Sequence, residues 1–350
     1  MRGRPWPEAY PRKHWTPQRI PGYRWGTQRL PEGPPPIREF TLHSYDGPAG
    51  LRLQDSPEPA PGPGELLVRV EAAGLALPLL RTLRGHGRPA LPHSPGGDLV
   101  GRVAAVGAGV TDYRPGDRVG GVAFSGVYAE LALVRPELVT PVAEDTPAAE
   151  ALAVVRSGLV ALAALRTGRL APGESVLITS AAGAVGHLAV QLAVALGARR
   201  VVAAAGSPAK AGFLRGLGAT EVVGYHELPA LDPVDLLVDN VGGETLHAAH
   251  AAVAPFGRLV VNSGAGGTLD AGTLLRGMHT ATGLAMARLA RHRPEFVTTC
   301  RTDLWQHLTT GTLRPACTTF PLEHLPAAAT LLEHRANLGK LAVLPTATAL

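Results

Sequence analysis

The sequence contains only two cysteines, Cys300 and Cys317, in 350 residues. Two cysteines are too few for a disulfide framework, and their spacing is not that of a metal-binding pair. We therefore expect two reduced thiols, in the core or at the surface, and no zinc-binding lobe built from cysteines.

Long apolar runs, a secretory leader and internal repeats are also missing. No uninterrupted run reaches the roughly 18 apolar residues of a spanning helix, and the N-terminus lacks the charged-then-apolar order of a signal peptide. No period of about 20 to 50 residues indicates a solenoid. The composition is that of an ordinary globular protein, with 45% hydrophobic and 17% charged residues, and the length suffices for two domains. We expect a cytoplasmic protein that does not associate with membranes.

Charge is distributed unevenly along the chain. The net charge of +5 comes entirely from residues 1–36, which hold seven basic and two acidic residues, nine prolines and three of the four tryptophans. Proline removes backbone donors and fixes φ, so we expect an irregular or polyproline-like extension. Two interpretations stay open: a weakly ordered appendage, or an arm that covers the rest of the chain, a partner or nucleic acid. The neutral charge of the remaining residues argues against nucleic acid.

Two patterns of apolar residues divide the rest of the chain. Residues 37–150 favour short strands between Gly/Pro turns, at 40–43, 51–54, 66–72, 100–106 and 118–123. Residues 151–298 alternate helical segments with short apolar strands at 175–179, 200–204, 236–239 and 259–262. Such alternation predicts parallel βαβ units in a doubly wound α/β domain. We expect residues 299–350 to complete the first domain, with a cleft between the two.

The strongest motif is a glycine turn between a strand and a helix. The strand at 175–179 leads into Ser180 and the turn AAGAVG at 181–186, and apolar residues then recur at helical spacing up to Gly197. Gly183 would let the backbone approach a pyrophosphate, and Gly186 would let the helix pack on the strand. The free amides of a helix N-terminus favour phosphate. The motif predicts a dinucleotide site, although Ala181 occupies the first glycine position.

The end of the next strand indicates which dinucleotide binds. An NAD site usually has an acidic residue there, which binds the ribose 2′-hydroxyl. Here the strand ends in Ala205-Gly206-Ser207, and no carboxylate is present to repel a 2′-phosphate. Ser207 can donate a hydrogen bond, while Lys210 and Arg199 or Arg200 can supply positive charge. We therefore predict NADPH as the cofactor.

Several further motifs resemble the medium-chain dehydrogenase/reductase superfamily. They are GGDLVGRVAAVGAGVTDYRPGDRV at 96–119, LITSAAGAVGHLAVQLAVALGAR at 177–199, VDNVGGETL at 238–246 and GRLVVNSG at 257–264, followed by a similar C-terminal segment from Phe320 to Lys340. The resemblance is nearest to the zinc-independent quinone oxidoreductase and enoyl reductase branch. It implies a GroES-like β-domain, a Rossmann domain, NADPH, a small-molecule substrate and usually a homodimer.

The resemblance also implies which residues bind the cofactor. They are Ala182, Gly183, Ala184, Val185, Gly186, Ser207, Lys210, Tyr225, Asn240, Val241, Asn262, Ser263, Gly264 and Lys340. Zinc-dependent relatives carry Cys and His where this chain has Ala76 and Gly97, so we expect no catalytic zinc.

One stretch departs from the pattern of the reductase branch. Where that branch usually has Asn, Asp and Tyr, this chain has Ala76, Leu79 and Arg81. Arg81 and Arg84 remain as candidate catalytic residues that could stabilise a developing enolate. We predict an NADPH-dependent reductase of an activated C=C bond or a quinone, with a hydrophobic substrate. Two alternatives stay open: a redox-neutral enzyme such as a cyclase or isomerase, and a non-catalytic binding protein on a reductase scaffold.

Overall fold

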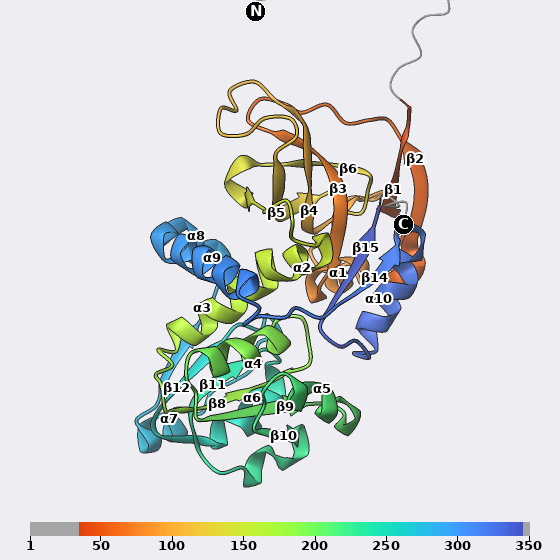
Figure 1. Ribbon diagram of the computed structural model, residues 1–350. Coiled ribbons are helices and arrows are strands. Elements are labelled where there is room, and N and C mark those ends of the chain that lie inside the picture. Colours follow the sequence, from red (N-terminus) through yellow and green to blue (C-terminus); the bar gives the residue numbers. More distant parts are fainter. Residues whose placement is uncertain (1–34, 346–350) are drawn as a thin grey trace, which may run out of the picture. The chain divides into compact units, whose positions relative to one another are not determined.

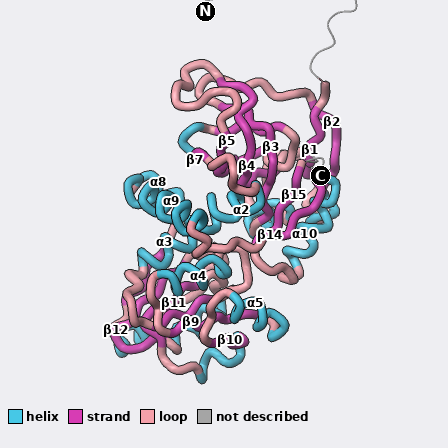
Figure 2. Tube along the Cα trace, viewed as in Figure 1, coloured by secondary structure: helices cyan, strands magenta, loops and turns pink. Residues whose placement is uncertain are grey.

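The computed structural model describes residues 35–345, and Figures 1 and 2 show how their helices and strands follow one another. The prediction for the proline-rich extension falls on residues that lie outside this range, apart from its last two positions. The described chain forms two large sheets and one short hairpin. We call the parts built on the two large sheets the β-lobe and the parallel-sheet lobe.

The β-lobe is built on a seven-stranded sheet with the order β14-β15-β3-β4-β5-β7, in which β6 also pairs with β3. Its strands are β3 (Leu66–Leu75), β4 (Pro95–Val106), β5 (Arg118–Ser125), β6 (Leu131–Val134), β7 (Val139–Pro141), β14 (Cys317–Pro321) and β15 (Lys340–Leu344). The hairpin of β1 (Ile37–Leu42) and β2 (Leu51–Ser56), the helices α1 (Leu77–Leu83) and α10 (Leu325–Glu333), and the short helices η1 (Gly47–Gly50), η2 (Pro136–Leu138) and η6 (Leu322–His324) complete it. Because β15 pairs with β3, the C-terminal strands belong to this lobe.

The parallel-sheet lobe is built on six parallel strands in the order β10-β9-β8-β11-β12-β13. They are β8 (Ser175–Ile178), β9 (Arg200–Ala205), β10 (Glu221–Gly224), β11 (Val234–Asp239), β12 (Val253–Val261) and β13 (Thr280–Gly283). The strand order reverses between β8 and β11, so the predicted doubly wound sheet is confirmed. The two central strands, β8 and β11, are buried almost throughout, which explains their apolar sequences.

The helices of this lobe pack on the sheet or on other helices. They are α4 (Gly186–Ala195), α5 (Ala211–Gly216), α6 (Gly243–Ala251), α7 (Ala271–Gly277), α8 (Met286–His292) and α9 (Pro294–Thr309), with the short helices η4 (Pro208–Lys210) and η5 (Tyr225–Ala230). Val297, Cys300 and Leu304 of α9 pack into the core of this lobe. The chain therefore returns to the β-lobe at β14, later than the boundary drawn from the sequence at residue 299.

One helical run connects the two lobes. It consists of α2 (Ala148–Leu152), the π-helical segment η3 (Ala153–Gly158) and α3 (Leu159–Thr167). α2 packs on β3 and β4, whereas α3 packs on α4 and α9. The run Ala148–Thr167 has the length and mean hydropathy of a membrane-spanning helix, although charged residues interrupt it, and 72% of its 18-residue apolar window is buried inside the protein. Its apolar side chains are thus used by the two cores.

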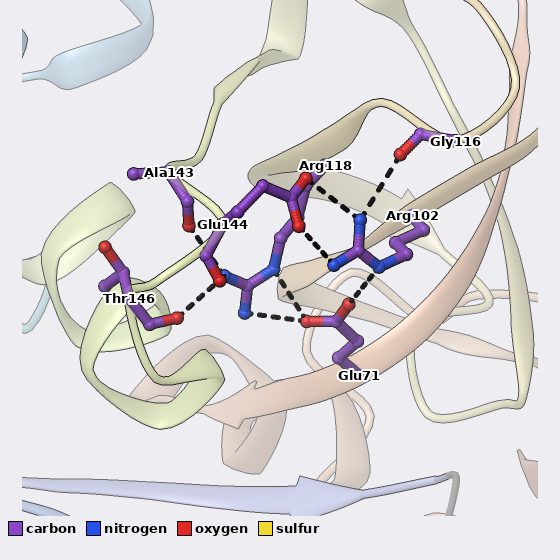
Figure 3. A network of polar contacts seen from close by, with 7 residues as sticks. All are labelled: Glu71, Arg102, Gly116, Arg118, Ala143, Glu144 and Thr146. Carbon is purple, nitrogen blue, oxygen red and sulfur yellow. Dashed lines mark hydrogen bonds and ion pairs between the residues drawn. The ribbon is translucent and has the colours of Figure 1, made fainter.

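A charged network fixes the start of this run (Figure 3). Arg118 of β5 is only 7% exposed and donates to Glu71 of β3 at 2.9 Å and to the Thr146 carbonyl at 2.7 Å. Arg102 of β4 pairs with the same Glu71 and with Glu144. The network ties three strands to the loop between β7 and α2, so it sets where the connecting helix leaves the β-lobe.

Candidate functional site

A cavity of about 1240 Å³ lies at the carboxyl ends of the parallel strands, and α1, the connecting helical run and the loop after α10 also contribute to its walls. This edge of a doubly wound sheet is where such proteins bind ligands. The structure gathers the predicted cofactor residues around the cavity: Ala182, Gly183, Ala184, Val185, Gly186, Ser207, Lys210, Tyr225, Asn240, Val241, Asn262, Ser263 and Gly264. The candidate catalytic residues Arg81 and Arg84 also line it, whereas Lys340 does not.

The turn after β8 admits only glycine where α4 begins. A Cβ on Gly186 would come within 2.3 Å of the Ser180 carbonyl oxygen and 2.6 Å of the Ala181 Cα, and both neighbours are backbone atoms. The helix therefore starts directly against the end of the strand, and its first residue lines the cavity. The amides and the partial positive charge at this helix N-terminus suit a diphosphate.

A buried histidine holds the glycine turn in place. The Nδ1 atom of His187 lies 2.9 Å from the Gly183 carbonyl oxygen, and Nε2 accepts a hydrogen bond of 3.1 Å from the Ala316 amide. A neutral imidazole with its proton on Nδ1 satisfies both contacts. Burial lowers the pKa of His187 to about 4, so the ring stays neutral near pH 7.

At the end of β9, polar and basic side chains gather on the cavity wall. Ser207 caps the short helix η4, and Nζ of Lys210 donates to the carbonyl oxygens of Arg335 at 2.7 Å and Asn337 at 3.1 Å. Tyr225 and Arg335 line the same cavity. Burial lowers the pKa of Lys210 and raises that of Tyr225. This group offers hydrogen-bond donors and positive charge to a phosphate.

Two basic residues that the sequence offered for this role are engaged elsewhere. Arg199 donates to the Gly173 carbonyl, and Arg200 forms an ion pair with Glu221 at 2.7 Å. Neither lines the cavity. Arg335, which was not among the predicted site residues, lines the cavity beside Lys210, because α10 brings a segment more than a hundred residues away to that lysine.

The ends of β8, β11 and β12 are joined by side-chain hydrogen bonds. Asn262 Nδ2 donates to Asn240 Oδ1 at 2.8 Å, and Asn240 Nδ2 donates to the Thr179 carbonyl at 2.7 Å. Ser263 Oγ donates to the Val241 carbonyl at 2.7 Å. These bonds hold the strand ends that form the cavity floor in one arrangement.

The β-lobe side of the cavity is mostly apolar. Ala76, Leu77 and Leu80 line it at the start of α1, while Leu79 is 3% exposed and points into the β-lobe core. Arg81 lies close to the loop after β12, because a Cβ on Gly264 would meet its Nη1 at 2.6 Å. Arg84 instead forms an ion pair with Glu333 of α10. Of the two candidate arginines, Arg81 is therefore the one without a carboxylate partner among the described residues.

Lys340 belongs to a buried ionic cluster instead of the cavity wall. Its Nζ lies 2.6 Å from Oδ2 of Asp98, and both side chains are fully buried. Oδ1 of Asp98 is 3.3 Å from Nη1 of Arg156, whose side chain is 32% exposed and lines the cavity. Burial alone would raise the pKa of Asp98, but the charges of Lys340 and Arg156 hold it below its ordinary value. Arg156 was not among the predicted site residues; the signal that pointed to it was a charged residue inside an apolar helical run.

The cavity is basic as a whole. Its charged lining residues within the described range are Arg81, Arg84, Arg156, Lys210 and Arg335, and no Asp or Glu of residues 35–345 lines it. Outside residues 1–36 the chain carries equal numbers of acidic and basic residues, so this excess is local. It favours an anionic ligand. Across the same residues, no group of three or more His, Cys, Asp or Glu side chains could hold a metal ion.

Comparison with known proteins assigns both lobes to one family. Residues 62–144 match the alcohol dehydrogenase GroES-like domain, and residues 184–301 match the model described as zinc-binding dehydrogenase. The chain is 34% identical over 244 residues to a quinone oxidoreductase of Pseudomonas aeruginosa. The aligned region covers 66% of this chain and 74% of that relative. The chain belongs to the medium-chain dehydrogenase/reductase superfamily, in the quinone oxidoreductase and enoyl reductase branch.

Two further matches extend the comparison. A synaptic vesicle membrane protein VAT-1 homolog of Rattus norvegicus is 35% identical over 239 residues, but the match covers 65% of this chain and only 59% of that relative's length. A mycobacterial protein solved in complex with NADPH superposes with a TM-score of 0.79 at 27% identity, covering 88% of this chain and all of the other. The predicted fold, a GroES-like domain with a Rossmann domain, is confirmed.

Proposed function

We propose that this chain is an oxidoreductase that uses NADPH, without zinc, to reduce an activated C=C bond of an enone or enoyl compound, or a quinone. The observation that carries the proposal is the pairing of two features on one cavity. A glycine turn at the start of α4 suits a diphosphate, and the group of Ser207, Lys210 and Arg335 suits a 2′-phosphate.

The residues present fit a dinucleotide phosphate. Gly186 allows the helix N-terminus to start against the strand, and the cavity offers about 1240 Å³ along the strand ends. No carboxylate of the described residues lines the cavity to repel a 2′-phosphate. A neighbour of similar fold was solved with NADPH. When bound, NADPH supplies a hydride to the substrate.

The remaining parts of the site bind and polarise the substrate. The apolar wall of Leu77, Leu80 and Val160 contacts a hydrophobic substrate and displaces water from it. Arg81 lies on the same helix as Leu77 and Leu80, reaches towards Gly264 and stabilises the negative charge that develops on the substrate oxygen. Solvent supplies the proton, because the positions where the branch usually has polar groups hold Ala76 and the buried Leu79.

The test is a turnover screen with the full-length chain. Purified protein is mixed with NADPH and a panel of enones, enoyl thioesters and quinones, and oxidation of the cofactor is followed by its absorbance. We expect oxidation with at least one member, and a loss of about 10-fold or more in kcat/KM when Arg81 is replaced by Gln. Substrate consumption with no change in NADPH would instead support a redox-neutral reaction, and Arg81→Gln with unchanged turnover would remove Arg81 from its role.

A further inference from the structure

Asp98 lies between two cations and neutralises only one of them. Lys340 Nζ is 2.6 Å from Oδ2, and Arg156 Nη1 is 3.3 Å from Oδ1. The shorter contact is the fully buried one, so the charges of Asp98 and Lys340 offset each other inside the protein. The cluster of three side chains therefore carries one net positive charge, and Arg156 is its only member that reaches the cavity.

The place of Arg156 differs from that of the other basic residues. Lys210 and Arg335 line the cavity together with Ser207 and Tyr225, which follow β9 and β10 and suit the adenosine end of the cofactor. Arg156 lies on the connecting helix beside Val160, and Asp98, its anchor, is on β4 next to β3. It thus belongs to the wall on the β-lobe side, where the proposed substrate binds.

A partly buried arginine with a surplus charge binds an anion in preference to a neutral group. The guanidinium has five N–H donors in a planar fork, and only Nη1 has a hydrogen-bond acceptor among the described residues. A carboxylate matches that fork and gives charge-assisted hydrogen bonds, whereas an ester or a ketone does not. Tethering by Asp98 lowers the conformational freedom that the side chain loses when it binds.

We propose that Arg156 binds a carboxylate of the substrate, so that the preferred substrates are activated alkenes that also carry an acid group. The inference rests on the proposed function and names the substrate class of that site. In the reaction a hydride from NADPH adds to the alkene carbon β to the activating ketone, and a proton from solvent adds to the α carbon. The products are the saturated keto acid and NADP⁺, and the carboxylate is unchanged.

The experiment compares an acid with its neutral counterpart. Benzoylacrylate and its methyl ester are assayed as substrates of the full-length protein with saturating NADPH. Binding of the saturated acid and its methyl ester to the NADP⁺ complex is measured by calorimetry. We expect the wild-type protein to prefer the acid, and Arg156→Gln to weaken binding and kcat/KM for the acid by about 10- to 100-fold while the ester changes little. Arg156→Lys, which keeps the charge without the fork, should lie between the two.

Arg166→Gln is the matched control. Arg166 lies on the same helical run, pairs with Asp303 and has a side-chain exposure of 28%, against 32% for Arg156, but it does not line the cavity. Arg166→Gln should leave the preference for the acid unchanged. It therefore controls for a general loss of stability caused by breaking an arginine–carboxylate pair.

Three results would overturn the inference. Equal losses for acid and ester in Arg156→Gln would show that Arg156 does not recognise the acid group. A parallel loss of NADP⁺ affinity would assign Arg156 to the cofactor. If the wild-type protein did not prefer the acid to its ester, the proposed substrate class of activated alkenes with an acid group would be wrong. Failure of the proposed function itself is distinguished by the turnover screen, since the wild-type protein would then oxidise NADPH with no enone, enoyl compound or quinone, neutral or acidic.

Discussion

The Ala316 amide donates a hydrogen bond of 3.1 Å to Nε2 of His187, across 129 residues of sequence. One ring thus holds the glycine turn on one side and the segment before β14 on the other. Gln191, one helical turn later, exchanges hydrogen bonds with the backbone of Arg314. The start of α4 is therefore fixed to the chain as it returns to the β-lobe.

The first prediction concerns the pH dependence of stability. The folded-state pKa of His187, about 4, lies below its ordinary value of 6.5. The unfolded state binds the proton more readily than the folded state. His187 therefore makes its full contribution to the free energy of unfolding above about pH 6.5, and that free energy falls as the pH drops towards 4. We expect the free energy of unfolding to fall by about 3 kcal/mol across that range, and urea unfolding at a series of pH values measures it. His187→Gln should flatten the slope, and exposed His292→Gln should not; equal slopes in all three proteins would contradict the account.

The second prediction concerns Gly186. Its replacement by Ala places a Cβ 2.3 Å from a backbone oxygen, so the turn must shift and the helix N-terminus with it. We expect NADPH affinity to fall by about 10-fold or more and stability to fall by about 1–3 kcal/mol. Gly212→Ala in α5 is the control, because nothing lies within 4 Å of its Cβ position. Calorimetric titration of both variants checks the difference, and unchanged affinity in Gly186→Ala would refute the role of the turn.

The third prediction concerns the network in Figure 3. Arg118→Met leaves Glu71 without its nearest cation and buries the Thr146 carbonyl without a donor. We expect a loss of about 3 kcal/mol in the free energy of unfolding. Arg114, whose side chain is 86% exposed, has Asp117 as its one ion-pair partner within residues 35–345, and Arg114→Met should cost less than about 1 kcal/mol. If both variants melted alike, the network would not stabilise the start of the connecting helix.

The sequence predicted the central strands of the parallel sheet, and the residues that it assigned to the cofactor line one cavity, apart from Lys340. Buried strands such as β8 and β11 are apolar throughout, and the glycine turn follows β8 directly, so both are visible in a short window. The edge strands β10 and β13 were missed because they are short and only partly buried. Their pairing is decided by their neighbours in the sheet and not by their own pattern.

The residues missed at the site depend on contacts between distant segments. Arg335 meets Lys210 only because α10 packs on the β-lobe and returns the following loop to the cavity. Lys340 was predicted to bind cofactor, yet the pairing of β15 with β3 places it against Asp98 inside the protein. Arg156 could have been suspected as a charge within an apolar helix, but its anchor on β4 is not readable from the sequence.

The central claim is that the cavity holds NADPH, and the most direct measurement is a paired titration with NADPH and NADH, followed by fluorescence of the full-length protein. The account predicts NADPH to bind at least about 10-fold more tightly, and Lys210→Ala and Arg335→Ala each to reduce that ratio while changing NADH affinity little. Equal affinity for the two cofactors, or a ratio that neither variant alters, would contradict it.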